Sequence, residues 1–125
     1  MDTSKFFRSF KYALTGIGTV FKEEFNARVH FLASLVVIVL GFVLDIAWFE
    51  WIIVIMVMGG VFSMELMNTS IEGLADLYSV ELNPKIKKIK DLAAGAVLVA
   101  SITALIIGLI IFLPKILVKL NFIPR

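Results

Sequence analysis

Three carboxylates stand close together in an apolar part of this sequence, within the segment MELMNTSIEGLAD at residues 64–76. They are Glu65, Glu72 and Asp76, and at about 100° per residue of helix the last two lie within roughly 20° of the first. Asn68 adds an amide on the same side of that helix. Because a lone carboxylate in lipid costs a few kcal/mol, this polar stripe indicates a functional site.

The depth of the stripe in a membrane suggests what kind of reaction it serves. Glu65 lies about 21 Å along a helix from Trp51, inside the inner part of a hydrocarbon core of roughly 30 Å, and Glu72 lies about 10 Å nearer to water. A transport pathway usually centres its ionisable residue near the midplane. A stripe that ends in water favours a reaction between a membrane substrate and a soluble one. A helix end that simply becomes polar explains Asp76 well but Glu65 poorly.

A second group of candidate residues follows in the segment NPKIKKIKD at residues 83–91. Asn83 and the proline after it mark a turn, so Asp91 falls in the first turn of the next span, where a helix N-terminus favours an anion. Lys90 could contact a phosphate group as a point charge. The other lysines of the segment are what membrane topology alone requires, so the spacing leaves both interpretations open.

The composition identifies the elements that must position these residues. Hydrophobic residues make up 60% of the 125-residue chain and the mean hydropathy is +0.99, well above a soluble domain. We therefore predict an all-α integral membrane protein with a single membrane domain. Its expected parts are an amphipathic surface helix at 1–27, spans at 29–47, 49–76 (with a cytoplasmic extension) and 91–113, and a cytoplasmic loop at 77–90.

The distribution of basic residues predicts the orientation of the chain. Nine lysines and arginines precede the first span or lie between the second and third spans, whereas three follow the third span. By the positive-inside rule, the N-terminus and the segment at 85–91 are expected in the cytoplasm, so the candidate site would lie on the cytoplasmic side of the plasma membrane. The first apolar run begins only near residue 29, without the pattern of a cleaved signal peptide. The chain has no cysteine, which excludes disulfides.

The N-terminal helix allows two interpretations. Phenylalanines and aliphatic residues recur at helical spacing between Ser4 and Asn26, with lysines and arginines among them, which is typical of a basic membrane anchor. An anchor explains neither Tyr12 nor Glu24. These two residues suggest that the helix also contributes to the site.

The polar segments together resemble a known family. ELMNTSIE at residues 65–72 with Asp76, and Lys90-Asp91 followed by AAGAV, look like the signature of the small prokaryotic diacylglycerol kinases. The resemblance extends from Lys5 to Pro114. Trp51, GGVFSMELMNTSIE and IIGLIIFLPK are similar to the Gram-positive branch, whose members phosphorylate undecaprenol.

The resemblance implies a role for each matching residue. Glu65 matches the catalytic base, Asn68 a residue that positions the reacting groups, and the pair Glu24 and Glu72 the carboxylates that hold the divalent metal of the nucleotide. Lys5 and Asn83 stand where the family often has arginine and histidine. The nucleotide-binding positions are Lys5, Tyr12, Glu24, Glu72, Glu81, Asn83, Lys90 and Asp91, and those lining the lipid headgroup region and acceptor are Arg28, His30, Glu65 and Asn68.

The implied activity is transfer of the γ-phosphate of ATP to the hydroxyl of undecaprenol, with Mg²⁺ as cofactor. The expected partners are ATP, a membrane lipid alcohol and two further copies of the chain, in a homotrimer with shared active sites; no nucleic-acid partner is expected. Diacylglycerol kinase is the alternative within the same class. From another class, a small multimeric transporter would use Glu65 as its coupling carboxylate and would leave Lys90 and Asp91 unexplained.

Overall fold

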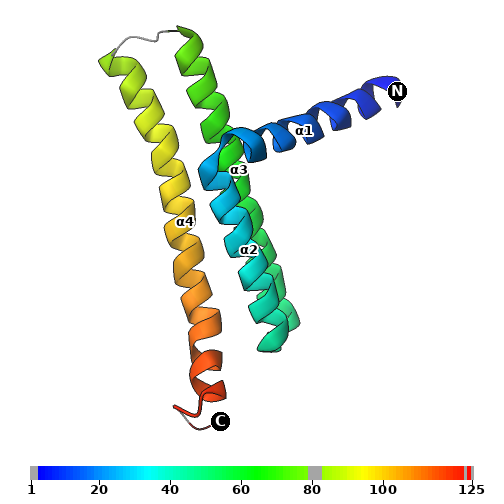
Figure 1. Cartoon of the computed structure of the whole chain (residues 1–125), viewed down its shortest axis with the longest axis vertical. Coiled ribbons are helices and arrows are strands. Elements are labelled where there is room, and N and C mark those ends of the chain that lie inside the picture. Colours follow the sequence, from blue (N-terminus) through cyan, green and yellow to red (C-terminus); the bar gives the residue numbers. More distant parts are fainter. Residues whose placement is uncertain (1–2, 79–82, 123, 125) are drawn as a thin grey trace.

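A computed structural model describes residues 3–78, 83–122 and 124 of the chain. The described residues form four helices, α1 (Thr3–Glu23), α2 (Phe25–Val43), α3 (Trp48–Tyr78) and α4 (Pro84–Lys119). In Figure 1, α2, α3 and α4 run alongside one another, while α1 leaves the bundle crosswise. The last three are long and apolar enough to cross a membrane. The prediction of an all-helical chain with three membrane-length helices is thus confirmed.

The chain turns sharply between α1 and α2 at Glu24. This residue has an extended backbone (φ −101°, ψ 118°), so one helix ends and the next begins within a single residue. The Arg28 guanidinium donates to the carbonyls of Lys22 (3.1 Å) and Phe21 (3.4 Å) at the end of α1. A cation at this position satisfies orphan carbonyls and complements the negative end of the helix dipole. Arg28 therefore fixes the corner from which α1 projects.

The hairpin between α2 and α3 is tight and is held by α4. Asp45 takes a left-handed conformation (φ 50°), which aspartate tolerates better than most residues. Glu50 accepts a hydrogen bond from the Ala47 amide at 2.7 Å and pairs with Lys115 of α4 at 3.1 Å. Lys119 donates to the Val43 carbonyl at 3.0 Å. Lys115 and Lys119 follow the third span, where the positive-inside rule predicts few lysines, and they join α4 to the hairpin.

Helices α3 and α4 form the most extensive pair. Their buried contact near the hairpin is made by Val54 of α3, Ile111 and Phe112 of α4, and Ile46 from the loop before α3. At the other end, Asn83 caps α4 by accepting a hydrogen bond from the Lys85 amide at 2.9 Å. Because of this cap, α4 begins at Pro84, ahead of the span expected at 91–113. Both α3 and α4 therefore extend past the level of α1 (Figure 1).

One glycine permits the close approach of α2 and α3. A Cβ atom at Gly41 would lie 2.5 Å from Cη2 of Trp51, and this indole also packs on Phe42 with ring centroids 4.9 Å apart. We expect Gly41→Ala to lower the free energy of unfolding by about 1–3 kcal/mol, because the indole must move out of its packed position. The measurement is reversible unfolding in detergent, with Gly108→Ala as control, since nothing lies within 4 Å of that position. Equal stability of the two variants would contradict the prediction.

Candidate active site

Glu65 is the only charged side chain of the described residues that is fully buried, with 2% of its surface exposed. Its Oε1 atom lies 3.1 Å from Nε2 of His30, which comes from the second turn of α2. The two groups are within ion-pair distance, but Oε1 has no well-aligned hydrogen bond to any described residue. Helix α3 thus presents a carboxylate to α2 inside the bundle, with imidazole as its neighbour.

Aromatic rings fix the end of α1 close to this carboxylate. Phe21 of α1 packs against Phe31 of α2 (5.4 Å between ring centroids) and Phe62 of α3 (5.8 Å). Phe62 precedes Glu65 by less than one helical turn, so the buried carboxylate lies at the level where α1 crosses the bundle (Figure 1). The apolar residues that place α1 therefore also place Glu24 near the site.

Glu24 and Glu72 lie near enough to Glu65 to repel its negative charge. Both side chains are half-buried, one at the corner between α1 and α2 and the other two turns farther along α3 than Glu65. No group of three or more histidine, aspartate or glutamate residues that could hold a metal ion occurs among the described residues. The site accordingly offers a divalent metal a small number of carboxylates and requires further oxygen ligands from a bound molecule.

The stripe continues to an ion pair that joins α3 to α4. Lys90 Nζ lies 2.9 Å from Asp76 Oδ1, and Glu72 also attracts the lysine. The hydrogen bond to Asp76 raises the pKa of the Lys90 ammonium group above its usual value. Sequence reasoning placed Asp76 on the stripe but gave it no role. The structure shows that it holds Lys90 beside Glu72.

Several predicted site residues make other contacts within this chain or lie on the projecting part of α1. Lys5 and Tyr12 are exposed on the part of α1 that projects away from the bundle (Figure 1). Asn83 is occupied in capping α4, and Asp91 pairs with Lys87 one turn before it at 2.5 Å. Arg28 contacts the end of α1, and Glu81 lies outside the described residues.

Polar atoms without partners surround the stripe. Asn68 Oδ1, Thr69 Oγ1 and Ser101 Oγ are buried and make no hydrogen bond to any described residue. Buried polar atoms are nearly always paired, so these are candidates for contact with a bound molecule or another chain. Asn68 was predicted from its place on the stripe. No pattern in the sequence distinguishes Thr69 or Ser101 from other small polar residues in a span.

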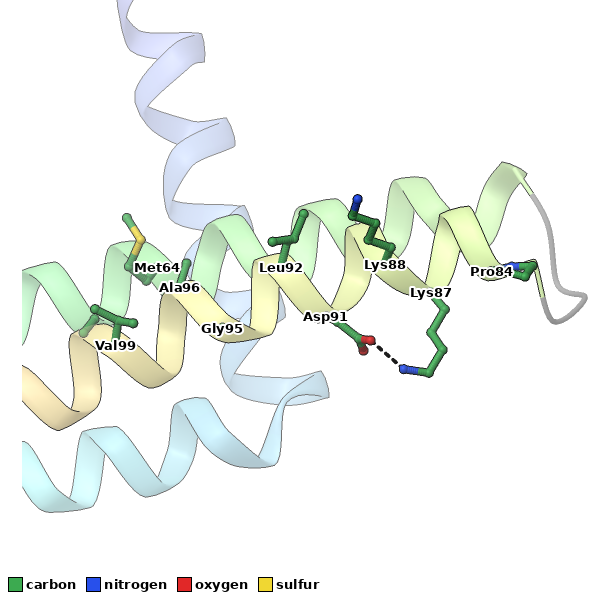
Figure 2. A pocket seen from close by; sticks show the side chains of 10 residues that line it. Met64, Pro84, Lys87, Lys88, Asp91, Leu92, Gly95, Ala96 and Val99 are labelled. Carbon is green, nitrogen blue, oxygen red and sulfur yellow. Dashed lines mark hydrogen bonds and ion pairs between the residues drawn. The ribbon is translucent and has the colours of Figure 1, made fainter.

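A separate groove of about 880 Å³ runs along α4 (Figure 2). Figure 2 shows the Lys87–Asp91 pair on the part of α4 nearer to Pro84, with Gly95, Ala96 and Val99 farther along the helix. Of the predicted site residues, the groove includes Asp91 but not Glu65 or Glu72. It is lined by Met64, Pro84, Lys87, Lys88, Asp91, Leu92, Gly95, Ala96, Val99 and Ala100.

Known proteins are similar to this chain in sequence. Residues 11–112 match the family described as prokaryotic diacylglycerol kinase. The chain is 42% identical over 114 residues to an undecaprenol kinase of Bacillus subtilis, covering 91% of this chain and 93% of that protein.

Diacylglycerol kinases are more distant relatives. The chain is 34% identical over 110 residues to a diacylglycerol kinase of Synechocystis, covering 87% of this chain and 63% of that protein. It is 34% identical over 89 residues to a diacylglycerol kinase of Pseudomonas aeruginosa, covering 71% of this chain and 72% of that protein. The family match spans the aromatic corner, the carboxylate stripe and the Asp76–Lys90 pair. The chain therefore belongs to the prokaryotic diacylglycerol kinase family.

Proposed function

We propose that this protein is an ATP-dependent kinase that phosphorylates the hydroxyl group of undecaprenol. The observation that carries the proposal is the buried Glu65, held at the level where α1 crosses the bundle, with further carboxylates leading from it to the charged end of α3 and α4. A long-chain alcohol in the bilayer could bring its hydroxyl to that depth. The 42% identity to the undecaprenol kinase of Bacillus subtilis supports this choice of acceptor.

The proposed topology places α1 in the cytoplasmic interface of the plasma membrane. Its apolar and basic residues recur at helical spacing, which suits an amphipathic helix lying in the plane of the membrane. The crosswise direction of α1 in Figure 1 supports this placement. Lysines on α1 and on the first turns of α4 would then face the cytoplasm, as the positive-inside rule requires. The ends of α3 and α4 beyond α1 would meet ATP there.

In the proposed reaction, Glu65 is the general base. Its carboxylate takes the proton of the lipid hydroxyl while that oxygen bonds to the γ-phosphorus of ATP, and the bond from this phosphorus to the β,γ-bridging oxygen breaks to release ADP. Asn68 lies one turn farther along α3 and would help to position the reacting groups. Arg28 and His30 would line the region of the lipid headgroup. Phosphoryl transfer depends mainly on such positioning and on compensation of charge.

Glu24 and Glu72 would hold the metal ion of the nucleotide. Mg²⁺ usually binds one or two protein carboxylates together with phosphate oxygens, and this pair fits that donor set. When bound, the ion would neutralise charge on the phosphates during transfer. Lys90, paired with Asp76, lies near Glu72 and could contact a phosphate directly. The remaining candidates for nucleotide contact are Lys5, Tyr12, Glu81, Asn83 and Asp91.

A homotrimer with shared sites would explain the distant candidates. Lys5 and Tyr12 project away from Glu65 of their own chain, so they could reach the site of a neighbouring copy. The residues that line the groove along α4 include Gly95, Ala96 and Ala100, which are small enough for close helix packing between copies. Thr69 and Ser101 have buried oxygens that another chain could satisfy.

Transfer of labelled γ-phosphate from ATP in mixed micelles tests the function. Undecaprenol and diacylglycerol are offered in parallel at equal concentration, with Mg²⁺ present. We expect faster labelling of undecaprenol. Preferential labelling of diacylglycerol would support the alternative function of a diacylglycerol kinase, the activity named for two of the less similar relatives. A well-folded protein that labels neither lipid would overturn the proposed function.

A further inference from the structure

Each turnover of the proposed reaction leaves a proton on a carboxylate that is closed off from water. Glu65 is 2% exposed, and no described residue forms a well-aligned hydrogen bond with its Oε1 atom. The site must release this proton before Glu65 can act as a base again. The structure offers a neighbour for that purpose, since His30 Nε2 lies 3.1 Å from Oε1 and its side chain is 24% exposed.

We propose that His30 carries the proton from Glu65 to water at the end of each turnover. The inference rests on the proposed kinase function. After phosphoryl transfer, the proton on Glu65 Oε1 moves to the lone pair of His30 Nε2, giving a carboxylate and an imidazolium. The imidazolium then loses the proton on Nδ1 to water, and the neutral Nε2–H form that remains returns to the Nδ1–H form by proton exchange with water before the next turnover. The overall reaction yields phosphorylated lipid, ADP and one proton, so neither residue is changed.

The other charged groups near Glu65 are carboxylates or cations that already have partners. Glu24 from the corner between α1 and α2, and Glu72 from α3, both repel the negative charge of Glu65. The cations of the region are engaged elsewhere. Arg28 donates to the Lys22 carbonyl at 3.1 Å, and Lys90 of α4 pairs with Asp76 at 2.9 Å.

Histidine also suits the task chemically. Its unperturbed pKa near neutrality lets it accept and release a proton under physiological conditions, which a neutral amide cannot do. Glutamine in its place could still donate a hydrogen bond to Glu65 from a similar position. Comparison of His30 with glutamine therefore separates proton transfer from simple positioning of the carboxylate.

The test measures steady-state lipid phosphorylation by His30→Gln across a range of pH. We expect kcat near neutral pH to fall about tenfold to a hundredfold, less than the hundredfold to ten-thousandfold contribution of a general base, because His30 acts on the proton only after phosphoryl transfer, with little change in KM for ATP or lipid. Added imidazole should restore part of the lost kcat. The deficit should also shrink as pH rises, because hydroxide can remove the proton from Glu65 directly. The matched control is Asn26→Gln, an exposed position one turn earlier on α2, which should behave as the wild type does.

The outcomes distinguish this inference from the proposed function. A wild-type protein that phosphorylates no lipid overturns both. Lipid phosphorylation by the wild type together with a His30→Gln variant of unchanged kcat at every pH overturns the relay alone. A low kcat that neither imidazole nor high pH restores, in a variant with wild-type thermal stability, also overturns it, because His30 would then only position Glu65.

Discussion

Replacement of Glu65 by glutamine is expected to lower kcat for lipid phosphorylation by about a hundredfold to ten-thousandfold, the usual contribution of a general base. Glutamine keeps the shape of the side chain but cannot take the proton of the lipid hydroxyl. The KM for ATP should change little, because the nucleotide is assigned to other residues. Labelled phosphate transfer at saturating ATP and lipid measures this effect.

The control for that experiment lies on the same helix. Glu50→Gln makes the identical change at the other end of α3, where Glu50 pairs with Lys115 and caps the helix. This variant should retain wild-type turnover if it folds, and its thermal unfolding shows whether it does. A Glu65→Gln variant that loses less than about tenfold would contradict the assignment of the base.

Replacement of Glu24 or Glu72 by glutamine is expected to raise the Mg²⁺ concentration needed for half-maximal activity. Each change removes a negative oxygen ligand from the proposed metal site. Interactions with a charged group contribute about 1.5–3 kcal/mol, so we expect a rise of about tenfold to a hundredfold. High Mg²⁺ should recover part of the activity, which it should not do for Glu65→Gln. Titration with Mg²⁺ at fixed ATP checks both statements.

An adjacent carboxylate provides the control for the metal site. Glu23 is exposed at the end of α1, next to Glu24, and it is not among the charges that act on Glu65. Glu23→Gln should therefore show the wild-type Mg²⁺ dependence. Equal shifts for Glu23→Gln and Glu24→Gln would indicate a general effect of surface charge and would contradict the assigned metal ligands.

The proposed site draws its parts from every helix, and each part has a separate structural support. Edge-to-face and tilted contacts between phenylalanine rings hold the end of α1, and the Arg28 guanidinium fixes the corner that carries Glu24. The Asp76–Lys90 pair joins α3 to α4 beyond Glu72. A change in any of these supports would therefore move a candidate site residue without removing it.

Local regularities of the chain were sufficient to predict much of this protein. Apolar runs gave three membrane-length helices, because length and hydrophobicity alone decide whether a helix can span lipid. Helical periodicity placed Glu65, Glu72 and Asp76 on one stripe, since their spacing is close to a whole number of turns. The family was also recognisable from the sequence, because its motif is long and continuous, and the match over residues 11–112 confirms it.

The contacts between helices could be decided only by the tertiary structure. His30 is far from Glu65 in the sequence, and no periodicity relates residues on different helices, yet packing brings their side chains to 3.1 Å. Packing likewise gave Asp76 a partner in Lys90 and directed the first turns of α1, which carry Lys5, away from the bundle. The sequence by itself therefore determined the helices, the stripe and the family, because these depend on neighbours along the chain. The partners of each charge were decided by the tertiary structure, because they depend on how the helices are oriented and packed in space.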